Sequence, residues 1–566
     1  MGRTPQNQWF NRLGSIVLTT WTLAACTIPN VPTEHIIMIN SEGVALDPTG
    51  NFGCPPKPAL CNGRHIPLWF LEYEPLDSEL EGANGARYEA YLQQLIAKLQ
   101  THPKDKDGKR KILLFVHGGL NEQTDSLRRA TKLAKLLEEQ EKSEYFPIFI
   151  NWDSSFFASY YDHLFHIRQG EYVAWWNPRG LLLSPAYLLL DIVRGIAGAP
   201  VLWTSELMKV EADEGLRKLL KKPEQEGCED QPLPFIGLTF EDHYERVSCK
   251  LKAEYRACSA GIDGQPASCP RVIPISEGEN QRQWFPEQFF SGVTWTLTLP
   301  TKIAFAPIVD AFGASAWNNM LRRTRRLFQT EMEFTRGANG PYSPPAGALA
   351  IFMHRLQQEV RKQPGEWEVT LVGHSMGTII LNEMIRRFGV VMEKDATGAE
   401  RVTFVMPFNR IVYMAAASSV RDYEDSIFPY LTMNTDAKFY HLTLHEEAEE
   451  RERQDLSIPN TDWEIPYVDP LMRGSLLVWI DDFLSNPQTY LDRTLGNYAN
   501  LMLTVHDTPE GLRDRIHIKA FSAGATQQAP QKHAEFTNKF RFWREACWTP
   551  SQTPQPNCYE KNGLLP

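Results

Sequence analysis

The chain has 566 residues, of which 42% are hydrophobic and 11% aromatic, which is enough for a sizeable core and excludes wholesale disorder. Its formal net charge of −11 disfavours a nucleic-acid partner and predicts no large basic field for anionic lipids. A chain of this length holds either several domains or one decorated α/β domain.

Residues 1–25 have the pattern of a secretory signal peptide. Arg3 and Arg12 flank the start, and the apolar stretch 13–21 is too short to span a bilayer. It ends in Leu23-Ala24-Ala25-Cys26, which resembles the bacterial lipobox, whose cysteine is acylated and becomes the first mature residue. The resemblance, with Thr27 after the cysteine, implies an envelope protein lipid-anchored at Cys26 in an outer membrane. The alternative is an ordinary signal cut near Ala25.

The cysteine count fits an exported chain with disulfides. Nine cysteines less Cys26 leave eight, an even number. Zinc is disfavoured because no C-x-x-C spacing occurs. Among many alternative pairings, the spacing suggests four local loops: Cys54–Cys61, Cys228–Cys249, Cys258–Cys269 and Cys547–Cys558.

The first part of the chain alternates between strands and helices. Residues 26–65 are expected to form an exported leader, and Pro67 confines a strand over 66–73 to a sheet edge. The remaining elements of the segment 66–152 predict a parallel sheet: a helix over 86–100, a strand over 111–116, a helix over 125–140 and a strand over 146–152.

This alternation stops over residues 153–343. The segment contains two apolar stretches, 180–207 and 289–317, and the second is followed by Arg322-Arg323-Thr324-Arg325-Arg326. We expect both stretches to pack on the core as buried helices, because core helices are commoner than lids. Lid helices or membrane-facing helices are the alternative. In either case the insertion should decide how a substrate enters.

The α/β alternation resumes over 344–547, and an irregular tail follows over 548–566. The predicted elements are a helix over 346–362, a strand over 368–372, a helix over 376–388 and strands over 409–417, 438–444 and 515–520. Between the second and third of these lies Gly373-His374-Ser375-Met376-Gly377. G-x-S-x-G between a strand and a helix predicts a nucleophile elbow with the Ser375 oxygen exposed above the sheet. A plain Gly-rich turn is the alternative.

Three features in this order make the chain similar to the α/β-hydrolase superfamily: a strand followed by His117-Gly118-Gly119-Leu120, the Ser375 elbow and a late histidine. The similarity covers roughly 66–152 and 344–545. It implies an α/β-hydrolase fold, a mostly parallel sheet flanked by helices. A large, mainly helical, disulfide-containing insertion would separate the oxyanion loop from the elbow. By the same resemblance, the oxyanion donors are the N–H of Met376 and that of Gly119 or Leu120.

The expected base is His533, in a loop after the last strand, with His506 and His517 as alternatives. The acid is less defined, because the loop after the preceding strand is rich in glutamate. Glu449 is favoured, and the alternatives are Glu446, Glu447 or Glu450, Asp422 or Asp425, and Asp455 or Asp462.

These features predict a membrane-anchored serine hydrolase that cleaves carboxylic esters, lipid or acyl esters among them, through an acyl-enzyme. No metal or organic cofactor is implied. The expected partners are an ester or lipid substrate and the membrane, and not nucleic acid. The alternative is a non-catalytic lipoprotein that uses a hydrolase fold as an envelope scaffold or binding module.

Overall fold

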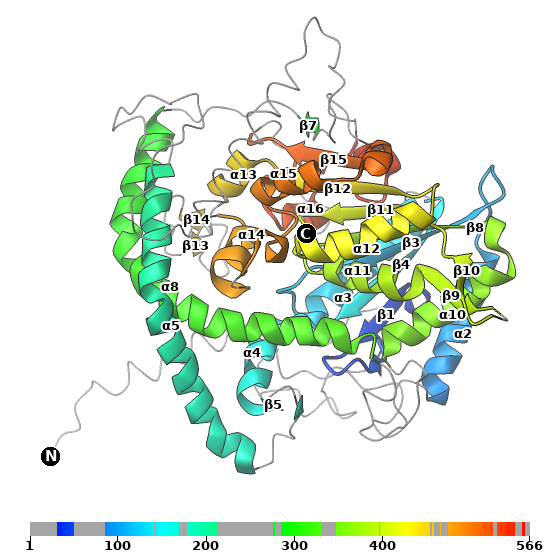
Figure 1. The fold of residues 1–566 in the computed structure, drawn as a ribbon, viewed down its shortest axis with the longest axis horizontal. Coiled ribbons are helices and arrows are strands. Elements are labelled where there is room, and N and C mark those ends of the chain that lie inside the picture. Colours follow the sequence, from blue (N-terminus) through cyan, green and yellow to red (C-terminus); the bar gives the residue numbers. More distant parts are fainter. Residues whose placement is uncertain are drawn as a thin grey trace, which may run out of the picture.

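A nine-stranded sheet forms the centre of the molecule in this computed structural model (Figure 1). The structure describes residues 31–49, 85–140, 143–168, 171–172, 178–212, 275–277, 285–329, 347–395, 397–452, 456–457, 464–465, 474–485, 487–524, 529–549 and 557–560. The strand order is β2-β1-β4-β3-β8-β11-β12-β15-β7, and only β2 runs antiparallel to its neighbour in this sheet. The predicted α/β class is therefore confirmed.

The inner strands are buried on both faces because helices cover them, which is why they read as continuous apolar runs in the sequence. They are β3 (Arg110–Val116), β4 (Tyr145–Trp152), β8 (Trp367–His374), β11 (Phe408–Met414), β12 (Lys438–Leu444) and β15 (Ile516–Phe521). The principal helices of this core are α2 (Ala86–Thr101), α3 (Gln123–Lys135), α10 (Ala348–Lys362), α11 (Gly377–Phe388) and α12 (Val420–Met433). Apart from α12, which was not predicted, these elements confirm the corresponding predictions, with ends shifted by a few residues.

Both edges of the sheet come from segments that were not expected to contribute strands. The predicted leader supplies β1 (Ile36–Ile39) and β2 (Ala45–Leu46), and the insertion supplies β7 (Ile275–Glu277), which pairs with β15. The expected strand over 66–73, the signal segment with Cys26 and three of the four proposed disulfides lie outside the described residues. The fourth, Cys547–Cys558, is formed, with Cα atoms 5.6 Å apart.

Three helices of the insertion contact one another: α4 (Phe156–Phe165), α5 (Pro178–Ala212) and α8 (Phe285–Arg326). α5 and α8 approach closely at Gly195, where an added Cβ would lie 2.2 Å from the Pro307 carbonyl oxygen. Arg323 of α8 is 2% exposed and forms two ion pairs. Its Nη1 lies 3.0 Å from Asp153 Oδ1, just after β4, and its Nη2 lies 2.6 Å from Asp162 Oδ2 on α4.

The expectation that both apolar stretches are buried is wrong for α5. Among the described residues, one helix segment, Leu182–Pro200, is long and apolar enough to cross a membrane, and only 22% of it is buried. In Figure 1, α5 and the first part of α8 lie along one side of the molecule, beside the sheet and its helices.

The remaining elements are short, apart from α15. They are the hairpins β5 (Ile167–Arg168) with β6 (Glu171–Tyr172), β9 (Val390–Lys394) with β10 (Glu400–Val405), and β13 (Leu456–Ser457) with β14 (Glu464–Ile465). The helices are α13 (Glu446–Arg451), α14 (Leu476–Trp479), α15 (Tyr498–Asp507), α16 (Glu535–Asn538) and α17 (Glu545–Trp548). Single-turn elements are η1 (Thr33–His35), η5 (Leu136–Gln140), η7 (Pro364–Glu366), η8 (Ile480–Leu484), η9 (Tyr490–Asp492) and η10 (Glu510–Arg515).

Candidate active site

The candidate site lies where the strand order changes direction. From β3 the chain moves to β4 on one side of it and later returns to β8 on the other, so β3 and β8 are neighbours with Val116 opposite Gly373. In open α/β sheets, ligands bind at the carboxyl ends of strands at such a switch point. The loop after β3 and the Ser375 turn after β8 both begin there.

The Ser375 turn has the sharp geometry that the sequence predicts. β8 ends at His374, α11 begins at Gly377, and Ser375 between them has φ +51°. A non-glycine residue at positive φ is uncommon and strained, and such strain concentrates at functional sites. Gly377 is required here, because an added Cβ would lie 2.3 Å from the Val116 carbonyl oxygen. Because glycine has no Cβ, the start of α11 packs directly on the end of β3.

The Ser375 side chain is buried in this conformation, so the prediction of an exposed serine oxygen is wrong for it. Ser375 is 1% exposed, and its Oγ has no hydrogen-bond partner among the described residues. The loop after β3 lies against it, since a Cβ added to Gly118 would come within 2.8 Å of the Ser375 Cβ. Two features that the sequence places apart are thus brought into contact.

The two candidate oxyanion donors of this loop, Leu120 and Gly119, differ in whether their backbone N–H is already used. Leu120 has φ +61°, and its N–H donates to the Ser154 carbonyl at 3.0 Å, so it is not available to an oxyanion. No described residue accepts a hydrogen bond from the N–H of Gly119 or of Met376. A Cβ on Gly119 would lie 2.3 Å from the Met376 Sδ, so these two donor residues are adjacent. Of the two predicted loop donors, Gly119 fits the role.

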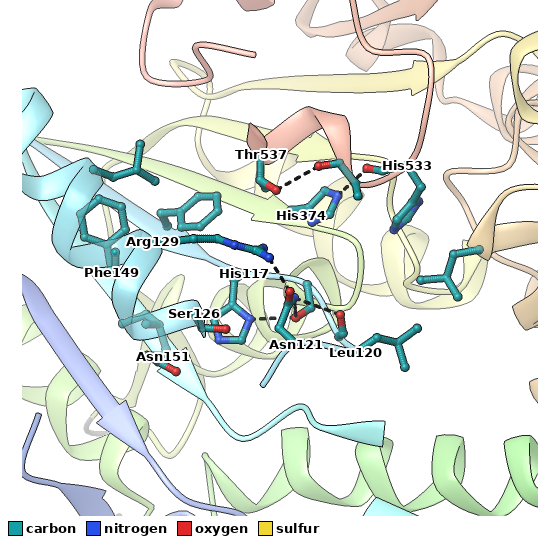
Figure 2. Close-up of a pocket in the computed structure, with 18 of the residues that line it drawn as sticks. His117, Leu120, Asn121, Ser126, Arg129, Phe149, Asn151, His374, His533 and Thr537 are labelled. Carbon is teal, nitrogen blue, oxygen red and sulfur yellow. Dashed lines mark hydrogen bonds between the residues drawn. The ribbon is translucent and has the colours of Figure 1, made fainter. Parts of the chain in front are cut away.

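Asn121 fixes the direction of these peptides. Its Nδ2 donates to the carbonyls of Gly118 at 2.9 Å and Gly119 at 3.0 Å, and its Oδ1 accepts from Arg129 at 3.1 Å (Figure 2). The C=O and N–H of a trans peptide point in opposite directions, so the Gly119 N–H points away from Asn121. The sequence analysis did not single out Asn121 or Arg129.

His533 reaches the site through its main chain as well as its ring. Its carbonyl accepts from His374 Nε2 at 3.0 Å, and the two ring centroids are 5.0 Å apart. Neither ring nitrogen of His533 has a hydrogen-bond partner among the described residues. Burial, and secondarily the neighbouring His374, lower the pKa of His533 well below its ordinary value. The ring is therefore neutral at pH 7, as a general base must be, and the same burial weakens its basicity until a carboxylate faces it.

The alternative histidines are placed differently. His517 lies on β15, half-buried, with its ring 5.1 Å from that of Tyr440. His506 belongs to α15, and its side chain lies outside what the structure describes. Of the two histidines whose side chains the structure describes, His533 contacts the elbow and His517 does not.

A glutamate that the sequence analysis did not consider contacts His533. The Oε2 of Glu452 accepts the His533 backbone N–H at 2.9 Å. The favoured Glu449 lies one turn earlier, buried, and its Oε2 accepts the Tyr498 N–H at 3.1 Å. Glu452 follows the last residue of α13 and its N–H donates to the Glu449 carbonyl, so the spacing of three residues is the signal that could have indicated it.

The other acid candidates do not contact His533 in the part of the chain that the structure describes. Asp422 pairs with Arg386 at 3.0 Å, Asp425 is exposed on α12, and Glu446 is half-buried at the start of α13. The side chains of Glu447 and Glu450, and the residues Asp455 and Asp462, lie outside the described set.

Burial perturbs both carboxyls, that of Glu449 on α13 and that of Glu452 just after the helix. It raises the pKa of Glu452 to about 7, against the opposing effect of the hydrogen bond from the His533 N–H. Burial also raises the pKa of Glu449 well above its ordinary value. Perturbed carboxyls of this kind cluster at functional sites, although structural networks produce them too.

A cavity of about 230 Å³ connects these groups (Figure 2). Its lining includes Gly118, Gly119, Leu120, Arg129, Glu452 and His533. Leu120 is 42% exposed, whereas the buried Ser375 does not line the cavity. A reacting group in this space would meet the oxyanion loop and the histidine, and would need a small movement to reach the serine.

The described residues contain no group of three or more His, Cys, Asp or Glu side chains placed to hold a metal ion. No protein-family model, curated protein or solved structure matches the chain.

Proposed function

We propose that this protein is a serine hydrolase of the α/β-hydrolase type that cleaves carboxylic esters through an acyl-enzyme. The observation that carries the proposal is the contact between a strained Ser375 turn and the Gly118-Gly119 loop at the switch point of the sheet. The order of the strands, with the elbow strand β8 beside the loop-bearing strand β3, supports the hydrolase fold.

In the proposed reaction, the Ser375 Oγ attacks the ester carbonyl carbon while a ring nitrogen of His533 takes the hydroxyl proton. The N–H groups of Gly119 and Met376 stabilise the resulting oxyanion. His533 then returns the proton to the departing alcohol, and a water molecule hydrolyses the acyl-serine by the same steps. Lipid or other acyl esters are the proposed substrates, from an enzyme anchored in the envelope at Cys26.

Glu452 is the proposed acid. Through Oε2 it already holds the backbone of His533, and its second oxygen is available for the ring N–H once the imidazole turns toward it. Catalytic hydrogen bonds are often long in substrate-free structures and tighten in the complex. An ionised Glu452 would stabilise the imidazolium that forms during attack.

The second candidate is a non-catalytic binding lipoprotein with the same fold. It is favoured by the burial of Ser375 and by the unbonded ring of His533 among the described residues. In that case the strained turn has no catalytic role, and no group in the cavity is an activated nucleophile.

A fluorophosphonate probe distinguishes the two. We expect labelling of the wild type, and none of Ser375→Ala or His533→Ala. Ser126→Ala is a matched control, because Ser126 lines the same cavity and its Oγ likewise has no partner among the described residues. The enzymatic proposal would be contradicted if the folded wild type is labelled neither in buffer nor in detergent micelles. Labelling only with micelles would show that the site opens at an apolar surface.

A further inference from the structure

Helix α5 has the reverse of the side-chain distribution expected for a helix in water. Its buried positions between 182 and 200 are small or polar and recur at helical spacing: Ser184, Asp191, Gly195 and Ala199. Most of its exposed positions are large and apolar: Leu182, Leu183, Leu188, Leu189, Leu190, Ile192, Val193 and Ile196. A water-facing helix buries its apolar stripe, whereas helices in lipid place small residues at helix contacts and apolar ones outside.

The buried polar stripe is held by specific contacts. Asp191 accepts hydrogen bonds from Ser315 Oγ at 2.9 Å and Tyr160 OH at 3.0 Å, and lies 3.1 Å from His163 Nε2. Gly195 allows the backbone of α8 to approach, as described above. The rotation of α5 about its axis is thereby fixed, so its apolar face stays directed outward.

A basic cavity adjoins this helix. It has a volume of about 860 Å³, and five arginines line it against two carboxylates, Asp191 and Glu383. Arg194 comes from α5, Arg387 from the last turn of α11, and the other three from the end of α8: Arg322, Arg325 and Arg326.

Part of this charge is balanced within the protein. Glu42 lies 3.2 Å from Arg322 and 3.9 Å from Arg326, and Arg387 pairs with Glu383 at 2.9 Å. Arg194 and Arg325 are exposed, and no described carboxylate lies within ion-pair distance of either. At longer range, the Asp310 carboxylate interacts electrostatically with Arg194. The net charge of −11 thus conceals a local excess of positive charge in this cavity, which is smaller than the large basic field that the sequence was not expected to provide.

We propose that α5 lays its apolar face into an anionic lipid leaflet and that the arginine cavity beside it receives the phosphates of the lipid headgroups. Apolar burial and headgroup attraction are the two signals that stable surface binding requires. Guanidinium groups match phosphate oxygens in geometry and charge. This docking surface does not depend on Ser375 being a nucleophile.

Vesicle flotation tests the proposal without the lipid anchor. All described elements lie after residue 30, so a chain that starts at residue 27 keeps the described fold and lacks Cys26. We expect it to bind phosphatidylcholine vesicles weakly, and to bind roughly tenfold more tightly when phosphatidylglycerol makes up about a third of the lipid.

Two double variants separate the two signals. Arg194→Gln with Arg325→Gln should remove most of the preference for the anionic vesicles and leave the weak binding unchanged. Leu189→Gln with Ile196→Gln should weaken binding to both vesicles by more than about tenfold. Circular dichroism and thermal unfolding check that each variant folds.

Matched controls come from elements other than α5 and α8, namely α3 and the β9–β10 hairpin. Arg128→Gln with Arg401→Gln removes two exposed charges, and Met392→Gln with Val402→Gln removes two exposed apolar side chains. Wild-type binding should persist in both. The proposal is overturned if the wild type binds neither vesicle, or if the controls lose as much binding as the test variants. Displacement from anionic vesicles by inorganic phosphate, but not by chloride at equal ionic strength, would assign the cavity to free phosphate instead.

Discussion

Replacement of Glu452 by glutamine should stabilise the protein at alkaline pH and impair its chemistry. The carboxyl is buried beside His533, and its pKa is raised to about 7. Glutamine keeps an oxygen that can accept the His533 N–H, so the loop stays in place, but it removes the ionisable proton. The substitution therefore separates the charge of this residue from its packing.

The magnitude follows from linkage. The ordinary pKa of a glutamate is 4.5, so the folded state retains a proton that the unfolded chain releases. The stability this contributes is complete below about pH 4.5 and is lost as the pH rises through about 7. The difference of 2.5 units corresponds to at most about 3 kcal/mol. The free energy of unfolding of Glu452→Gln, relative to wild type, should be more favourable at pH 8 than at pH 4 by up to that amount.

The assay is urea unfolding at pH 4, 6 and 8 in parallel with ester hydrolysis. We expect kcat/KM to fall by roughly a hundredfold to ten-thousandfold, the range associated with loss of the orienting acid. Glu449→Gln is the matched control, because it neutralises a buried carboxyl one turn away that binds the Tyr498 N–H instead. It should relieve a similar cost of burial and leave kcat/KM within a few-fold.

Two results would refute this reasoning. Full activity of Glu452→Gln with loss of activity in Glu449→Gln would identify Glu449 as the acid, as the sequence favoured. If the unfolding free energies of Glu452→Gln and the wild type differ by the same amount at every pH, the pKa of Glu452 is not raised.

Three further predictions concern the frame around the site. Gly118→Ala should abolish probe labelling and cost about 1–3 kcal/mol in urea unfolding, because the added Cβ would lie 2.8 Å from both the Ser375 Cβ and the His374 Nδ1; wild-type labelling would contradict the close contact. His374→Ala should slow labelling about tenfold by freeing the His533 carbonyl, whereas His374→Gln, which keeps a donor, should restore part of the rate; equal rates would show that this contact does not position His533. Arg323→Met should cost about 3–5 kcal/mol of unfolding free energy because it leaves two carboxylates unpaired, and a loss below about 1 kcal/mol would show that the pairing is dispensable.

The sequence predicted the inner sheet well because its strands are continuous apolar runs followed by helical periodicity. It could not predict the edges, since β1, β2 and β7 have only four, two and three residues. Such short strands carry no periodic signal, and they form because a partner strand distant in sequence offers an unpaired edge.

The candidate site shows a similar division. Ser375, the Gly118-Gly119 loop and His533 follow local patterns, and the structure brings them to one end of the sheet. Glu452 does not follow such a pattern, because the glutamates of this acidic run look alike in sequence and only the fold decides which of them faces His533. The orientation of α5 was equally hidden: its composition is apolar, but only tertiary contacts at Asp191 and Gly195 decide which face is covered.

The central pairing of the sheet also sets an order of assembly. β3 pairs with β8 in a register that joins Arg110 to Trp367, so the middle of the sheet stays open until most of the chain has been synthesised. The apolar helix α5 emerges well before that pairing closes. Contacts this distant in sequence form slowly and expose apolar surface meanwhile. We therefore expect the chain to be most prone to aggregation after α5 has been synthesised and before β8 pairs with β3.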